Sequence, residues 1–250
     1  MSLNKEKSIS IERRKKLYEL IERLKIDTIY VQSIKYNETN KLKIIDEALT
    51  HTSANSLINH ERLEFLGDAV LRLAATEFIE RTYSSLSVGE RSELRSQLVS
   101  DQWLHEVGQD ISIEKTLLLG PKAAKDKSAL ATFQAETTEA LIGALFECFN
   151  DLQPIHQWLG IYWTKESKKV MADPHKNNPK SALQEWSQAK GMLLPNYETN
   201  ELSHVHGNPK RFFCKVQVSG KSIAEGWGRS IKEAEKAAAK EALKNLKNFC

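Results

Sequence analysis

Cysteine is scarce in this sequence, and long apolar runs are missing. The three cysteines among 250 residues are Cys148, Cys214 and Cys250, and they form no Cys-x-x-Cys pair. This spacing argues against a disulfide framework or a cysteine zinc site and suits a reducing compartment. No apolar run approaches membrane-spanning length, and the first 16 residues lack the apolar core of a signal peptide. We therefore expect a cytoplasmic protein with no membrane partner.

The formal net charge is only +3, but the charges are unevenly distributed. Residues 176–250 hold 13 Lys and Arg against 7 Asp and Glu, whereas residues 1–175 hold 23 against 26. An acidic front and a basic tail fit a metal-dependent catalytic part joined to a part that binds a polyanion. A charge drift between two domains without functional meaning is the plainer alternative.

The hydrophobic pattern changes near residue 173. Before it, apolar residues recur at helical spacing over residues 11–26, 42–50, 61 to about 81, 101–109, 133–149 and 155–171. Ser87 and Glu90 have the spacing of a capping box at a further helix start. After it, a helix over residues 181–190 is followed by strand-like segments at 196–202, 212–218 and 221–228 and an alanine-rich helix over 231–246. The sequence predicts an all-helical domain over residues 1–172, a linker over 173–179 and a small α+β domain of α-β-β-β-α order over 180–250.

Three carboxylates interrupt an otherwise apolar segment in the first part. Glu61, Glu64 and Asp68 stand at offsets of three, four and seven residues, which place them on one face of a helix. Grouped acids need a counter-charge, and a divalent cation such as magnesium suits hard oxygen ligands. A solvated acidic face with one ion pair through Arg62 is the alternative, and the apolar residues around the acids leave little room for such a face.

A second acidic pair, Glu136 and Glu139, has the same helical spacing on the predicted helix 133–149. If the two helices pack face to face, they present four carboxylates to one site. Bound divalent ions lower the pKa of a water molecule and stabilise charge on a phosphodiester transition state. The alternative is an acidic pair on the protein surface.

The segments 48–53, 61–71 and 139–145 resemble the signatures of the ribonuclease III family, the endonucleases specific for double-stranded RNA. The resemblance implies magnesium, or manganese, held by Glu64, Asp68, Glu136 and Glu139, with Asp68 and Glu139 catalytic and no small-molecule cofactor. It also implies a homodimer into which Phe65 packs. The family usually has Asp at the position of Glu136. We interpret His51 as a hydrogen-bonded structural histidine.

The second part resembles the double-stranded-RNA-binding domain. Such modules read the shape of A-form RNA through two minor grooves and the phosphates between them. The resemblance implies RNA contacts from three regions: Ser181, Gln184, Glu185 and Gln188 on the first helix, His206 in the loop between the first two strands, and Arg229, Ser230, Lys232 and Lys236 at the start of the last helix. Ile231 stands where the family usually has Lys.

Together these features predict a magnesium-dependent endoribonuclease that cleaves RNA duplexes and leaves 5′-phosphate and 3′-hydroxyl ends. The resemblance implies substrates in ribosomal RNA maturation and messenger RNA processing. A duplex-RNA-binding protein with weakened catalysis is the alternative, and the departures at Glu136 and Ile231 favour it.

Overall fold

The computed structural model describes residues 9–36, 40–54, 57–172, 179–205 and 207–247. The chain divides into two compact units, Met1–Lys168 and Lys169–Cys250. Of the predicted linker, residues 173–178 lie outside the described residues, and Pro179 is the first residue of a helix. The domain boundaries taken from the sequence therefore stay a prediction.

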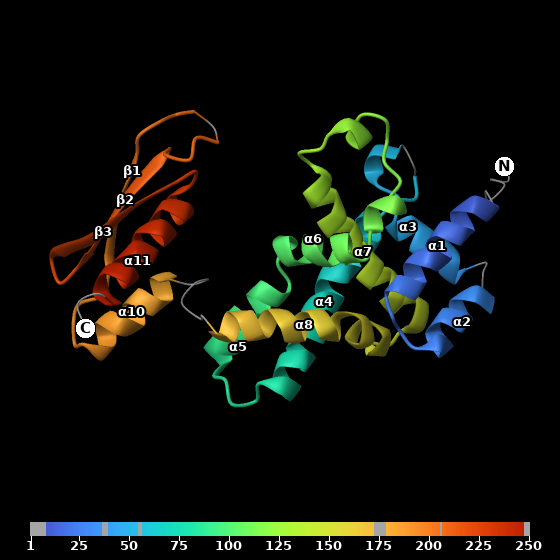
Figure 1. Cartoon of the computed structure of the whole chain (residues 1–250), viewed down its shortest axis with the longest axis horizontal. Coiled ribbons are helices and arrows are strands. Elements are labelled where there is room, and N and C mark those ends of the chain that lie inside the picture. The colour runs from blue at the N-terminus through green and yellow to red at the C-terminus, as the bar shows by residue number, and fades with distance from the viewer. Residues whose placement is uncertain (1–8, 37–39, 55–56, 173–178, 206, 248–250) are drawn as a thin grey trace. The chain divides into compact units, whose positions relative to one another are not determined.

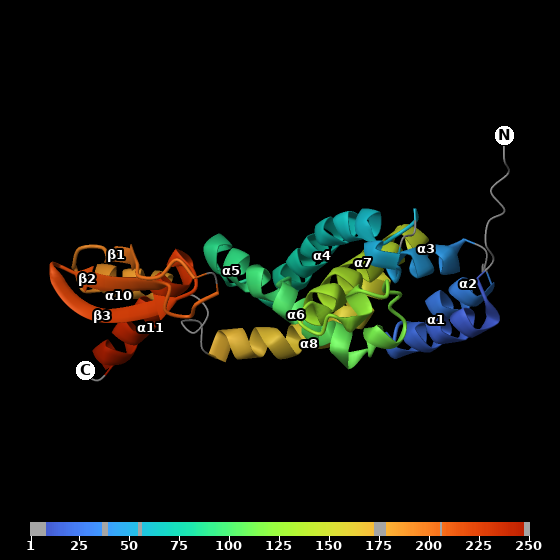
Figure 2. The same ribbon diagram turned by 90° about the horizontal axis from the view of Figure 1, so that it is seen from above.

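The first unit is built from helices (Figure 1). They are α1 (Ile11–Arg23), α2 (Thr28–Tyr36), α3 (Lys41–Ala48), α4 (Glu61–Thr82), α5 (Val88–Leu98), α6 (Asp101–Asp110), α7 (Leu130–Phe149) and α8 (Gln153–Ala172), with 3-10 turns at Thr52–Ala54, Ile113–Lys115 and Ala123–Lys125. Helices α3, α4 and α6 all pack against α7 (Figure 2). Six consecutive residues of α7, 140–145, are buried, as expected of a helix enclosed on every side.

Helices α4 and α7 cross at two glycines. A Cβ atom on Gly67 would lie 2.0 Å from the backbone oxygen of Glu139, and one on Gly143 would lie 2.1 Å from the backbone oxygen of Leu63. Any side chain at either position would force the helices apart. The crossing therefore requires glycine on both helices, and it holds the acidic segment of α4 beside that of α7.

Local sequence signals predicted much of this unit correctly. The predicted apolar stripe of α1, with Leu17, Leu20, Ile21 and Leu24, is buried. Ser87 accepts a hydrogen bond from the backbone of Glu90, whose carboxylate accepts one in return, so the predicted capping box is present. Helix α2 was not predicted from the sequence. Its tyrosine Tyr30 packs edge-on against Phe149 at 4.9 Å and donates a hydrogen bond to Asp151, contacts that lie far along the chain.

The second unit has the predicted α-β-β-β-α order: α10 (Pro179–Ala189), β1 (Asn196–Glu201), β2 (Phe212–Val218), β3 (Lys221–Gly228) and α11 (Ile231–Lys247). The strands form an antiparallel sheet in the order β1-β2-β3, and both helices cover one face of it (Figure 1). Ser219 and Gly220 turn the β2-β3 hairpin with positive φ angles of 50° and 76°, as a two-residue hairpin loop requires. Gly226 lies where a Cβ would come within 2.2 Å of the backbone of α11, so the helix sits directly on the strand.

Among the residues that the structure describes, no helix has both the length and the apolar character needed to cross a membrane.

Candidate active site and RNA-binding surface

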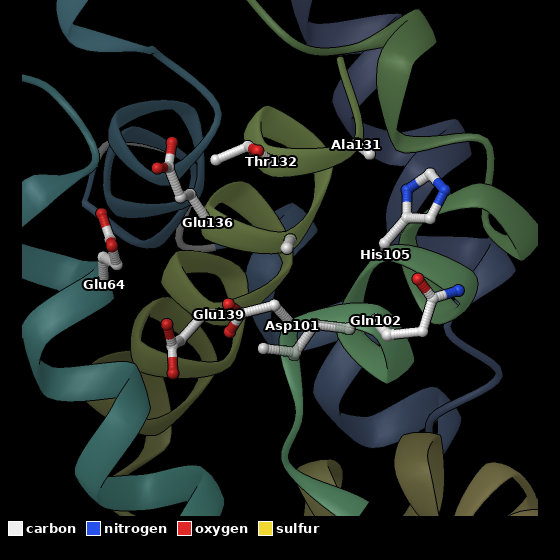
Figure 3. A pocket seen from close by; sticks show the side chains of 10 residues that line it. Glu64, Asp101, Gln102, His105, Ala131, Thr132, Glu136 and Glu139 are labelled. Atoms are coloured by element: carbon white, nitrogen blue, oxygen red, sulfur yellow. The ribbon is translucent and has the colours of Figure 1, made fainter. Parts of the chain in front are cut away.

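A pocket of about 270 Å³ lies among helices α4, α6 and α7 (Figure 3). Its walls carry three of the predicted acids, one from α4 and two from α7. The lining residues are Glu64, Asp101, Gln102, Leu104, His105, Ala131, Thr132, Ala135, Glu136 and Glu139. The structure thus brings together carboxylates that are more than 70 residues apart in the sequence.

The acids in this pocket hold protons more tightly than free carboxylic acids. Burial raises the pKa of Glu139 to about 7, and the charges of Asp68, Glu64 and Asp101 add to the effect. Burial also raises the pKa of Glu136, with a further contribution from the charge of Glu64. Burial raises the pKa of Glu64, and the nearby charge of Glu61 adds to it. Negative charge is therefore concentrated here beyond what the surrounding side chains compensate.

Asp68 lies one turn beyond Glu64 and is not among the lining residues. It accepts a hydrogen bond of 2.8 Å from Arg72, and this ion pair is half-exposed. The negative charge of Asp68 still acts on Glu139, because this charge adds to the raised pKa of Glu139. Asp68 therefore stands at the rim of the acidic pocket, with Arg72 as its counter-charge.

Asp101 is an acid of this site that the sequence reasoning missed. It is the first residue of α6, where Ser100 caps the helix by accepting a hydrogen bond from the backbone of Trp103. Its charge contributes to the raised pKa of both Glu136 and Glu139. An acidic residue in a first helical turn is common, so nothing in the local sequence marked it as part of a site.

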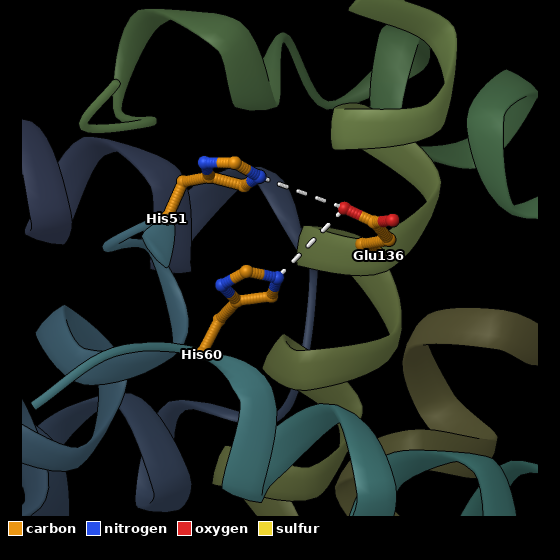
Figure 4. Close-up of side chains that lie close together, drawn as sticks. All are labelled: His51, His60 and Glu136. Atoms are coloured by element: carbon orange, nitrogen blue, oxygen red, sulfur yellow. Dashed lines mark ion pairs between the residues drawn. The ribbon is translucent and has the colours of Figure 1, made fainter. Parts of the chain in front are cut away.

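His60 is a second missed residue, and it lies next to His51. Both imidazoles are buried and stacked, with ring centroids 5.0 Å apart. The Nε2 atom of His60 lies 3.3 Å from Glu64 and 3.8 Å from Glu136, and Nε2 of His51 lies 3.8 Å from Glu136 (Figure 4). His51 is hydrogen-bonded through Nδ1 to Ser53 at 2.7 Å, as predicted for a structural histidine, but its other nitrogen faces the site.

Within the part of the chain that the structure describes, His51, His60 and Glu136 form a group that could hold a metal ion. Their potential ligand atoms all lie within 4.8 Å of one another. The four predicted acids do not form such a compact group among the described residues.

Phe65 lies on α4 between Glu64 and Asp68, and its side chain points outward. It is 86% exposed, which is unusual for a phenylalanine. An exposed aromatic ring in the middle of a helix that carries the site is a feature of interaction surfaces.

In the second unit, the predicted RNA-contacting residues of α10 share one face. Gln184, Glu185 and Gln188 are exposed and Ser181 is half-buried, while Leu183 on the other side is in the core. At the other predicted surface, Arg229, Ser230, Lys232 and Lys236 are exposed around the start of α11. Ser230 accepts a hydrogen bond from the backbone of Glu233 and so caps the helix. His206 lies outside the described residues.

Two family models match the chain. Residues 41–148 match a ribonuclease-III-like model, and residues 179–246 match the double-stranded RNA binding motif. The chain is 54% identical to Ribonuclease 3 of Prochlorococcus marinus, with 96% of each chain covered. It is 39% identical to Ribonuclease 3 2 of a Nostoc species, over 81% of this chain and 84% of that one.

Solved structures also resemble the chain. One is the nuclease domain of ribonuclease III from Campylobacter jejuni, 28% identical with a TM-score of 0.42, covering 64% of this chain and 99% of that one. The other is Dicer from Pichia stipitis, which is 25% identical with a TM-score of 0.44. The match covers 81% of this chain and 92% of that one. The sequence matches over almost its whole length show that the chain belongs to the ribonuclease III family.

The raised pKa of Glu139 predicts how the metal-free protein responds to pH. The folded-state pKa of about 7 lies above the unfolded value of about 4.5, so the folded chain loses stability as the pH rises through this window. A Glu139→Gln variant lacks the ionisable group and should be more stable than the wild type at pH 8 by about 1–2 kcal/mol, because solvent screens part of the cost of the charge. At pH 5 the difference should be much smaller.

Urea denaturation in the presence of a chelator measures this difference. Glu19→Gln serves as a matched control, because Glu19 is exposed on α1, and it should show no gain at either pH. An equal effect of Glu139→Gln at both pH values would contradict the pKa assigned to Glu139.

Proposed function

We propose that this member of the ribonuclease III family hydrolyses both strands of double-stranded RNA in a magnesium-dependent reaction and leaves 5′-phosphate and 3′-hydroxyl ends. One observation carries the proposal. Carboxylates from α4 and α7 share a pocket, and the charge of Glu64 on α4 adds to the raised pKa of Glu136 and Glu139 on α7, in a chain that also carries a double-stranded RNA binding motif.

The acids in the pocket and at its rim fit magnesium. The preferred ligands of this ion are oxygens, and Glu64, Glu136 and Glu139 in the pocket and Asp68 at its rim supply carboxylates from two helices. The raised pKa values of three of them indicate negative charge that a divalent cation would offset. When bound, magnesium supplies a Lewis acid for the phosphodiester and a water molecule of lowered pKa.

The chain's own residues orient this set. Arg72 holds the carboxylate of Asp68 through a 2.8 Å hydrogen bond, which limits its rotation at the rim of the pocket. His60 and His51 stand beside the carboxylate of Glu136, each 3.8 Å from one of its oxygens. Glu136 is one methylene longer than the aspartate usual in the family, and these two rings restrict the space in which the longer side chain moves. We assign Asp68 and Glu139 the catalytic roles.

Cleavage of a labelled RNA duplex tests the activity. The wild-type protein should produce fragments only when magnesium is added, and Glu139→Gln should reduce the rate by at least about 100-fold, since it removes a charged ligand of the site. The same variant should keep its affinity for the duplex, because Glu139 lies in the nuclease unit. Glu19→Gln is the matched control and should cleave normally. If the wild-type protein binds duplex RNA but magnesium yields no fragments, the alternative of a binding protein with weakened catalysis is correct.

The RNA-binding motif contributes affinity through two exposed surfaces of the second unit. The side chains on α10 are polar and suit a minor groove with its 2′-hydroxyls, whereas Arg229, Lys232 and Lys236 at the start of α11 suit phosphates. The positive end of the α11 dipole adds to the attraction for phosphate. Ile231 is exposed between these basic residues, so one phosphate contact usual in the family is missing.

Lys232→Ala should weaken duplex binding and reduce the slope of log affinity against log salt concentration by about one, since one phosphate contact is lost. Fluorescence anisotropy at several salt concentrations measures both quantities. Lys221→Ala is the matched control, because Lys221 is exposed at the hairpin turn, at the end of β3 far from the start of α11. An unchanged salt slope for Lys232→Ala would remove this residue from the phosphate surface.

We further propose that the active unit is a homodimer formed through the nuclease unit. Phe65 is a large apolar side chain, almost fully exposed, on the helix that carries Glu64 and Asp68. A twofold interface at this helix buries the ring against a second copy and sets two active sites in fixed relation, one for each RNA strand.

Sedimentation velocity should therefore show a dimer for the wild-type protein and a monomer for Phe65→Glu, since the variant places a charge at the centre of the interface. Leu193→Glu changes an exposed apolar residue of the second unit and should leave the dimer intact. A Phe65→Glu protein that remains dimeric would place the interface elsewhere.

By family resemblance we also propose a cytoplasmic location and a role in ribosomal RNA and messenger RNA processing. Manganese is a second candidate for the metal ion.

A further inference from the structure

The proposed magnesium site uses carboxylate ligands and does not require the pair of buried histidines, His51 and His60. His51 follows α3 and His60 precedes α4, and both direct an Nε2 atom toward the carboxylate of Glu136 (Figure 4). His60 is 3% exposed and His51 is 9% exposed. Two imidazoles and a carboxylate that converge in this way form a ligand set of mixed nitrogen and oxygen.

The distances are close to those of a coordinated ion. Two ligand atoms bound at about 2.0–2.2 Å to one tetrahedral ion lie roughly 3.3–3.5 Å apart. The two distances of 3.8 Å from Nε2 of His51 and of His60 to Glu136 exceed this value by about 0.3–0.5 Å. The potential ligand atoms of the three residues all lie within 4.8 Å of one another, so side-chain rotations bring them to an ion.

The surroundings orient the rings for this purpose. Nδ1 of His51 accepts a hydrogen bond from the backbone N–H of Ser53 at 3.0 Å and lies 2.7 Å from the Ser53 hydroxyl. These two contacts fix the ring with Nε2 directed toward Glu136. The hydroxyl of Ser53 is itself held by the backbone N–H of Gly120 at 3.0 Å. The described residues provide no hydrogen-bond partner for Nδ1 of His60, so the polar contacts of that ring all lie on the Nε2 side, where the carboxylates are.

Donor chemistry decides which ion this set would take. Imidazole nitrogen suits zinc, iron, cobalt and other divalent transition metals, whereas magnesium prefers oxygen ligands and water. Two histidines with one carboxylate, and a second carboxylate in reach, match the ligand sets in which such ions are found. We propose that His51, His60 and Glu136 form a binding site for a divalent transition metal of the zinc type.

Glu136 belongs to this set and also to the proposed magnesium set. A transition metal held together with Nε2 of both histidines turns the Glu136 carboxylate toward the imidazoles and away from the other acids, and this inhibits cleavage. This consequence rests on the proposed function, whereas the metal site itself does not, and the two are tested by different measurements.

Titration of the full chain with Co²⁺ in excess magnesium tests the site, since Co²⁺ reports its own ligands. We expect one Co²⁺ per chain with the intense visible absorption of a four-coordinate ion. We also expect imidazole proton signals of His51 and His60 that are shifted by the paramagnetic ion in the proton NMR spectrum. Zn²⁺ should displace Co²⁺ and abolish both the visible absorption and the shifted imidazole signals.

His60→Asn should weaken Co²⁺ binding by at least about 10-fold, and His51→Asn should do the same, because each removes a nitrogen ligand. His105→Asn is the matched control, because His105 lines the same pocket but lies outside the group, and it should bind Co²⁺ as the wild type does. Circular dichroism confirms the fold of each variant. If either histidine variant is unfolded, Glu136→Gln replaces it and should show the same loss.

Only the weak absorption of six-coordinate Co²⁺, or equal binding by wild type and His60→Asn, would overturn the site. A chain that binds Co²⁺ through both histidines but cleaves no RNA with magnesium would uphold the metal site and reject the proposed function. Normal cleavage of RNA with magnesium, without Co²⁺ bound by the histidines, would uphold the proposed function and reject the metal site.

Discussion

The close crossing of α4 and α7 is the constraint on which the site depends. Gly67 and Gly143 let each backbone reach the other helix, and a methyl group at either position would meet a carbonyl oxygen at about 2 Å. Because the backbones touch, carboxylates from both helices reach one pocket. The acidic residues supply the chemistry, but the two glycines determine whether those residues meet at all.

Bringing these carboxylates together in one pocket has an unfavourable electrostatic energy. Burial raises the pKa of Glu64, Glu136 and Glu139, and the charges of neighbouring acids add to the effect. Only partial counter-charges stand nearby, such as Arg72 at Asp68. Strongly shifted pKa values in a concave site are typical of functional centres. A cation that binds the cluster would offset this negative charge.

Sequence reasoning succeeded where the signal was local. The stripe of α1, the Ser87–Glu90 capping box and the Ser219–Gly220 hairpin each depend on neighbours within a few residues, and the structure has all three. It missed α2, whose Tyr30 is anchored by Phe149 and Asp151. It also missed His60, which is part of the site only because the fold places it beside Glu136 on another helix. Glu64, Glu136 and Glu139 could be predicted from helical spacing and family resemblance. The distances between these carboxylates, and the position of Asp101 beside them, depend on tertiary contacts that no local sequence pattern encodes.

Cation binding by carboxylates of both helices is tested most directly by a high-resolution crystal structure of the protein grown with magnesium. We expect an octahedral ion whose protein ligands include Glu64 or Asp68 from α4 together with Glu139 from α7, at oxygen distances of about 2.0–2.1 Å. A pocket that holds only water at saturating magnesium, or an ion bound by one helix alone, would contradict this expectation.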